Sequence, residues 1–161
     1  MAEAPGRLEL VRRFVNTLDV DSCVDSLDSP QALKEWLTSN RVLSPDATVD
    51  AGALGTFHEL RETLRVLAHA NAHCQSDPAA LGRLDEIASG LPVRLTFGAE
   101  AGLTPACAGT DAAAAEVLSI VHQAMADGTW PRFKACKAET CAWAYYDHSR
   151  NRSATWCSIR S

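Results

Sequence analysis

Residues 132–157 read RFKACKAETCAWAYYDHSRNRSATWC, and the three cysteines within them are spaced as Cys136-x4-Cys141-x15-Cys157. A structural zinc ion takes four ligands in two pairs, each close in the sequence, with an intervening segment that brings the pairs together. The stretch therefore predicts a Zn²⁺ site held by these three thiolates. We expect a fourth cysteine after Ser161 to complete the site, with water, His148 or a partner chain as the alternatives.

The residues around the cysteines resemble a known family. They are Arg132 before the first cysteine, then Cys141-Ala-Trp-Ala-Tyr-Tyr-Asp147, Ser149-Arg-Asn-Arg152 and Trp156-Cys-Ser158. This pattern resembles the CGNR zinc finger, found in bacterial proteins behind an ABATE domain and described as belonging to stress-induced transcriptional regulators. The resemblance implies a small treble-clef-like zinc module that binds nucleic acid, DNA above all. It also implies truncation before the Cys-Gly-Asn-Arg motif and thus partial zinc occupancy, and Ala154 and Thr155 stand where the family has two arginines.

The preceding sequence has the apolar spacing of helices. Positions three and four apart predict helices over residues 7–19, 29–40, 51–76, 77–90 and 110–126. The second starts at Ser29-Pro30, where serine caps the free amides and proline fits the first turn. The order of elements, with Phe14-Val-Asn-Thr17 and Leu60-Arg-Glu-Thr-Leu-Arg65, resembles the ABATE domain. We expect a helical ABATE-like domain over residues 1–129 that folds alone, and a zinc module over residues 130–161.

A small β-hairpin is the exception in this mainly α fold. Val93, Leu95 and Phe97 alternate with Arg94 and Thr96, which is the pattern of a strand with one apolar side. Residues 98–102 then read as a turn into a second strand over residues 103–106.

The charge is unevenly placed along the 161 residues. The net charge is −5, yet from residue 130 onward six Lys or Arg face two acids. Such asymmetry indicates a basic tail that works apart from an acidic body. The basic side chains that we expect to bind nucleic acid are Lys134, Lys137, Arg150 and Arg152. A merely solvated surface, or pairing of an arginine with Asp147 or with the acidic body, remains open.

A second candidate site involves Asn16, which lies among apolar residues and must find hydrogen bonds if buried. Asn16 either ties the first helix to a neighbouring loop or points, with Arg61 and Arg65, into a pocket for a small anionic effector. Arginine suits such a ligand because its planar guanidinium donates two parallel hydrogen bonds to a carboxylate.

The sequence favours a regulator over an enzyme. It contains no catalytic motif, and a closed four-thiolate zinc site leaves no position for an activating water. No stretch approaches the roughly 20 apolar residues of a membrane span, so we expect a cytoplasmic protein without membrane contact. The interpretation is a zinc-binding transcriptional regulator with a ligand-sensing helical domain. The alternative is a protein-interaction or assembly module whose zinc is purely structural, and a homodimer is left open.

Overall fold

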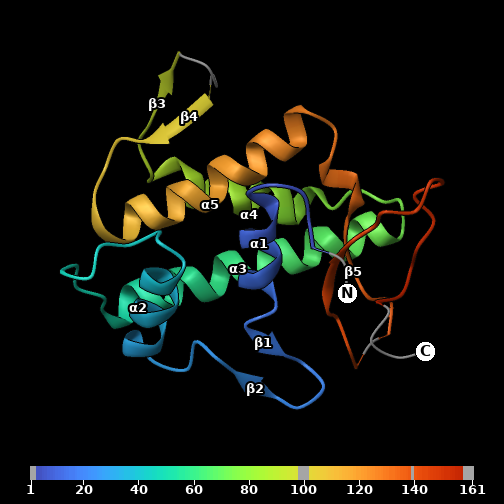
Figure 1. The fold of residues 1–161 in the computed structure, drawn as a ribbon, viewed down its shortest axis with the longest axis horizontal. Coiled ribbons are helices and arrows are strands. Elements are labelled where there is room, and N and C mark those ends of the chain that lie inside the picture. Colours follow the sequence, from blue (N-terminus) through green and yellow to red (C-terminus); the bar gives the residue numbers. More distant parts are fainter. Residues whose placement is uncertain (1–2, 98–101, 139, 158–161) are drawn as a thin grey trace.

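The computed structural model describes residues 3–97, 102–138 and 140–157 (Figure 1). The helices are α1 Leu8–Val15, α2 Pro30–Ser39, α3 Ala51–Ala72, α4 Pro78–Ser89 and α5 Gly109–Ala126, followed by the short 3-10 helix η1 Trp130–Arg132. The strands form antiparallel pairs: β1 Leu18–Asp19 with β2 Val24–Asp25, β3 Val93–Thr96 with β4 Gly102–Pro105, and β5 Phe133–Ala135 with β6 Ala144–Tyr146. The expected fold class, mainly helical with a small β-hairpin, is confirmed, and two further short strand pairs are present.

Side-chain caps fix the starts of three helices. The Ser29 hydroxyl accepts a hydrogen bond from the Ala32 amide at 3.2 Å, and Asp50 and Asp77 cap α3 and α4 in the same way. Each cap satisfies one backbone donor that the first turn leaves free. Helix α1 ends at Val15, earlier than expected, because the chain turns there into the β1–β2 hairpin, which the apolar spacing did not indicate.

Helix α3 is the centre of the core. Its Phe57, Leu60 and Leu64 are buried against α1, where the rings of Phe14 and Phe57 meet edge to face with centroids 5.8 Å apart. The buried apolar side chains of α2 and α5 complete the same cluster. None of the described helices is both long and apolar enough to cross a bilayer.

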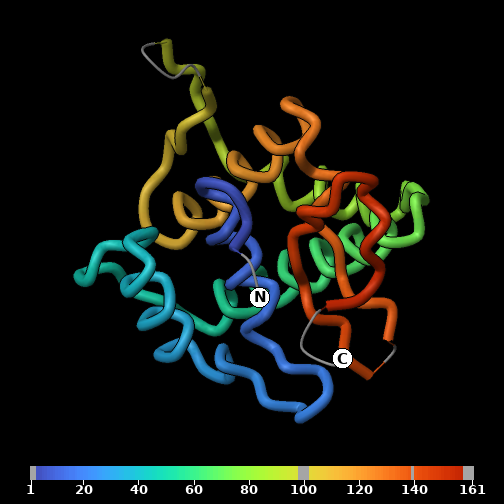
Figure 2. The backbone as a smooth tube through the Cα atoms, turned by 45° about the vertical axis from the view of Figure 1, so that its right-hand side comes forward, coloured from blue at the N-terminus to red at the C-terminus, as the bar shows by residue number. Residues whose placement is uncertain are grey.

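The core continues past residue 129, where the sequence predicts a boundary between domains. Phe133, Ala135 and Ala144 of the β5–β6 hairpin are fully buried in the cluster that contains the helices. Figure 2 shows the C-terminal segment lying beside α3. The start of the zinc module therefore shares its interior with the helical body.

The β3–β4 hairpin is present as expected, although residues 98–101 of its turn lie outside the described residues. It projects beyond the helices (Figure 1), and Val93, Leu95 and Phe97 are 43%, 69% and 86% exposed. The apolar side of this hairpin is therefore largely uncovered.

Candidate metal centre and basic loop

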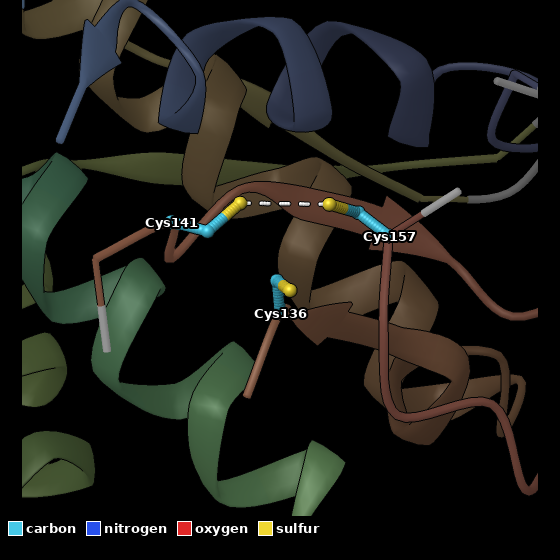
Figure 3. A group of neighbouring side chains, drawn as sticks. All are labelled: Cys136, Cys141 and Cys157. Atoms are coloured by element: carbon cyan, nitrogen blue, oxygen red, sulfur yellow. Dashed lines mark hydrogen bonds between the residues drawn. The ribbon is translucent and has the colours of Figure 1, made fainter. Parts of the chain in front are cut away.

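The thiols of Cys136, Cys141 and Cys157 converge on one point (Figure 3). Their sulfur atoms all lie within 4.8 Å of one another, and Cys141 Sγ and Cys157 Sγ are 3.5 Å apart. Sulfurs bound at about 2.3 Å to a tetrahedral zinc ion are roughly 3.8 Å apart, so the arrangement fits that ion. Among the described residues, this is the one group of at least three His, Cys, Asp or Glu side chains that could hold a metal.

The backbone around the first two cysteines forms the tight turn that such a site needs. The Cys136 amide donates to the Trp143 carbonyl at 2.9 Å, and the Cys141 amide donates to the Ala138 carbonyl at 2.9 Å. Ala142 has φ 45, a left-handed conformation that turns the chain back into β6. The third cysteine is brought close because the Lys137 amide donates to the Thr155 carbonyl at 3.1 Å.

The local environment favours the thiolate form of Cys136. Burial alone would raise its pKa, but hydrogen bonds from the backbone at Cys157 and Ala138 and from the two neighbouring thiols outweigh burial and lower the pKa. A thiolate is the form that binds metal. The three thiols therefore fit Zn²⁺ in geometry, and the lowered pKa of Cys136 favours the form that binds it.

An ion pair inside the module links β5 to the loop before the third cysteine. Lys134 and Asp147 are 2% and 1% exposed, and Lys134 Nζ lies 2.7 Å from Asp147 Oδ2. The same ammonium donates to the Arg152 carbonyl at 2.6 Å and to the Ala154 carbonyl at 3.1 Å. All three of its donors are therefore used. Burial raises the pKa of Asp147, but the hydrogen bonds from Lys134 and Ser149 outweigh it and hold the pKa at about 2.

The prediction that Lys134 binds nucleic acid is wrong, because its ammonium lies inside the module with every donor occupied. Lys137 is half-buried, whereas Arg150 and Arg152 are exposed. Neither of these two arginines forms an ion pair within the described part of the chain. Of the four basic residues proposed from the sequence, the structure brings Arg150 and Arg152 to the surface of one loop.

Sequence reasoning missed a structural role for Arg132. Its guanidinium donates to the Asp147 carbonyl at 2.8 Å and to the Ser149 carbonyl at 2.9 Å, so it holds the other end of the same loop. The sequence did contain an indication of this structural role, since Arg132 and Lys134 flank the fully buried Phe133 at the start of the zinc-finger pattern.

The structure does not bring Asn16, Arg61 and Arg65 together at a ligand pocket. Arg61 is buried and binds both carboxylate oxygens of Asp25 at 2.7 Å, while Arg65 donates to the carbonyls of Val15 at 2.6 Å and Ala142 at 3.0 Å. Their guanidinium groups are occupied within the protein, so the pocket prediction is corrected for both. These bonds fasten the β1–β2 hairpin and the zinc module to α3.

Asn16 has a structural role, as the simpler of the two predictions had it, but it ties the end of α1 to strand β6 and not to a neighbouring loop. Its side chain donates to the Ala144 carbonyl at 2.8 Å and accepts from the Ala144 amide at 2.7 Å, as a neighbouring β-strand would. Asn16 also lines a small open cavity of about 250 Å³, but the basic residues beside it there are Arg12 and Arg13.

His148 is not a zinc ligand in this arrangement. Its Nε2 lies 2.8 Å from the Glu3 carbonyl, its ring meets Tyr146 edge to face, and it is absent from the thiol group. The fourth cysteine expected after Ser161 falls outside the described residues.

Comparison with known families agrees with this geometry. The sequence model of the ABATE family, described as "Putative stress-induced transcription regulator", matches residues 8–142. The model of the CGNR zinc finger matches residues 132–161, which contain all three clustered cysteines. A search of curated proteins finds no match to the chain. The chain therefore belongs to the ABATE family and carries a CGNR zinc finger in its C-terminal part.

Proposed function

We propose that this protein is a zinc-dependent regulator that binds the phosphate backbone of duplex DNA through the loop between its second and third cysteines. Zinc supplies no chemistry in this proposal beyond holding three parts of the chain together. Cys136, Cys141 and Cys157 hold the ion, and Arg150 and Arg152 contact phosphate.

The observation that carries the proposal is the way in which the loop 147–154 is braced. Arg132 and Lys134 bind its backbone carbonyls from the inside, and Asp147 accepts from the Ser149 and Ala154 amides at 2.9 and 3.0 Å. The buried Lys134 and the half-buried Arg132 thus fix the backbone, while the two exposed arginines have no ion-pair partner among the described residues. A fixed loop loses less conformational entropy when its side chains bind a ligand.

The charge distribution is consistent with a local contact. Residues 1–129 carry nine Lys or Arg and eighteen Asp or Glu, so this acidic body repels DNA. The zinc module carries the opposite sign. We therefore expect a small interface in which the zinc module, and not the body, faces the DNA. The affinity should fall as the salt concentration rises, because phosphate binding releases counterions.

Fluorescence anisotropy of zinc-loaded protein on labelled duplex DNA, measured over a range of salt concentrations, tests the proposal. Changing Arg150 and Arg152 together to alanine should weaken binding on every sequence and reduce the log–log salt slope by about two, since each lost contact contributes roughly 0.9. Zinc content and the helical melt should not change.

The matched control removes two cations from the helical body, with Lys34 and Arg83 changed to alanine. This variant should bind DNA only slightly more weakly than the unchanged protein, through the added long-range repulsion, and its log–log salt slope should stay the same because no phosphate contact is lost. Binding that is insensitive to salt, or equal loss in both double variants, would contradict the proposal and favour a protein-interaction module with a structural zinc.

A further inference from the structure

The segment 142–144, which directly follows the second cysteine, is bound to the helical body. The Arg65 guanidinium of α3 donates to the Ala142 carbonyl at 3.0 Å. The Asn16 side chain, at the end of α1, accepts from the Ala144 amide at 2.7 Å and donates to the Ala144 carbonyl at 2.8 Å. Three hydrogen bonds from side chains 77 and 128 positions away therefore hold the backbone beside this cysteine.

The backbone of this segment needs such support. Ala142 has φ 45, in the left-handed region that a residue with a side chain rarely adopts. The turn at Ala142 lets the Cys136 amide donate to the Trp143 carbonyl at 2.9 Å, and it leaves the thiols of Cys136 and Cys141 beside each other. A hydrogen bond to the Ala142 carbonyl fixes the peptide unit that leaves this turn. The placement of Cys141 therefore depends on Arg65.

Arg65 is itself held in place by the helical body. The residue is 7% exposed, and its guanidinium also donates to the Val15 carbonyl at 2.6 Å and to the Glu62 carboxylate at 3.0 Å. Val15 is the last residue of α1, so the planar guanidinium is fixed by partners on two helices. None of these partners is a metal ligand, and the anchor therefore does not require a bound metal.

We infer that Arg65 and Asn16 are positioning residues of the zinc site, which raise its affinity for zinc without contacting a ligand atom. A site whose ligands are placed in advance loses less conformational entropy when it binds. Here the entropy of the segment 142–144 is lost when the body folds, and zinc binding does not have to supply it. The inference rests on the zinc-binding part of the proposed function and is independent of DNA binding.

Arg61, one turn earlier on α3, provides a matched control. It is also buried, and it binds both carboxylate oxygens of Asp25 at 2.7 Å, the Thr17 hydroxyl at 3.2 Å and the Glu62 carboxylate at 2.9 Å. All of these partners belong to the helical body. Removing either arginine should destabilise the body, but the hydrogen bond to the zinc module is lost only with Arg65.

The zinc affinity of the chain, measured by competition with a chromophoric chelator in the absence of nucleic acid, tests the inference. Groups that orient metal ligands typically contribute about 10–100-fold to metal affinity. Arg65→Met should weaken zinc binding about tenfold, whereas Arg61→Met should change it by less than about twofold. Both are measured well below the melting temperature of the weaker variant. Because a tighter ligand stabilises the folded state more, the rise in melting temperature on adding zinc should also be smaller in Arg65→Met than in Arg61→Met.

Asn16→Ala is a second variant, which keeps the inference testable if Arg65→Met does not fold. It removes both hydrogen bonds to Ala144 from a half-buried position, and zinc binding should again weaken about tenfold. Its control is Asn40→Ala, which removes a hydrogen bond from the Asn40 side chain to the Trp36 carbonyl within the body. This control should bind zinc as the unchanged chain does.

Two results would overturn the inference. One is a zinc affinity that is the same in the unchanged chain, Arg65→Met and Asn16→Ala. The other is a loss of affinity in Arg61→Met as large as the loss in Arg65→Met, which would show that general destabilisation of the body is the cause. An unchanged chain that binds no zinc would instead overturn the metal site on which the inference rests.

Discussion

Replacing Lys134 with methionine is the sharpest test of how the zinc module is built. The change keeps an unbranched side chain, shorter by one atom, and removes the ammonium of a residue that is 2% exposed and bonded to Asp147, Arg152 and Ala154. The Asp147 carboxylate is then left buried without its cation, and two carbonyls lose their donor. Removing one partner of a buried ion pair costs about 3–5 kcal/mol.

This loss is large relative to the total stability of a domain, which is about 5–15 kcal/mol. For a chain of this size it corresponds to a melting temperature lower by on the order of 10 °C. Urea denaturation of zinc-loaded protein measures the free energy of unfolding directly. The double variant Lys134→Met with Asp147→Leu should regain part of the loss, because it leaves no unpaired buried charge, and the coupling should exceed about 1 kcal/mol.

Lys137→Met is the matched control, since it removes the same charge three residues away on a half-buried side chain. It should change the free energy of unfolding by less than about 0.5 kcal/mol. If Lys134→Met costs less than about 1 kcal/mol, or if the two changes at Lys134 and Asp147 are simply additive, the ion pair does not brace the loop and the reasoning fails.

Two further predictions concern pH and the extent of the folding unit. The depressed pKa of Asp147, about 2, means that its contribution to stability is complete above the unfolded value of 3.8 and is lost as the pH falls toward 2. The test compares the urea midpoints of the unchanged chain and of Asp147→Asn, both without metal. The difference between the two midpoints should shrink from pH 5 to pH 2.5, and a difference that stays constant would contradict this prediction. A fragment of residues 1–128, which the sequence predicts to fold alone, lacks the buried Trp130 and Phe133. Because loss of a large buried aromatic costs about 3–5 kcal/mol, its helical melt by circular dichroism should fall well below that of the full chain. Equal melting temperatures would show that the body is independent.

Local signals in the sequence were sufficient for the helices and for the cluster of three cysteines. Ser29-Pro30 and Asp77-Pro78 start α2 and α4 because the cap and the proline act on adjacent residues. The cysteine spacing likewise depends on tight turns within one short segment. These features need no knowledge of distant parts of the chain.

The roles of the long cationic side chains depended on partners far away in the sequence. Arg61 meets Asp25 across 36 residues, and Arg65 meets Ala142 across 77. Their position was nevertheless informative, since residues 57, 61 and 65 are four apart and Phe57 belongs to the buried stripe of α3. A cation on such a stripe is buried together with its hydrogen-bond partners. The alternation of apolar and polar residues in β3 predicts a strand with one apolar face. It does not show whether that face is covered in the folded protein, because the pattern is the same in both cases.

The two family matches overlap over residues 132–142, and the structure gives this overlap a physical meaning. The segment contains β5, the first cysteine pair and the carbonyl to which Arg65 donates. Asn71 of α3 also donates to the carbonyls of Trp130 and Phe133, at 3.0 and 2.9 Å. The strand that positions Cys136 is therefore held by the same helix that organises the core. We therefore expect part of the free energy of metal binding to be shared with the helical body.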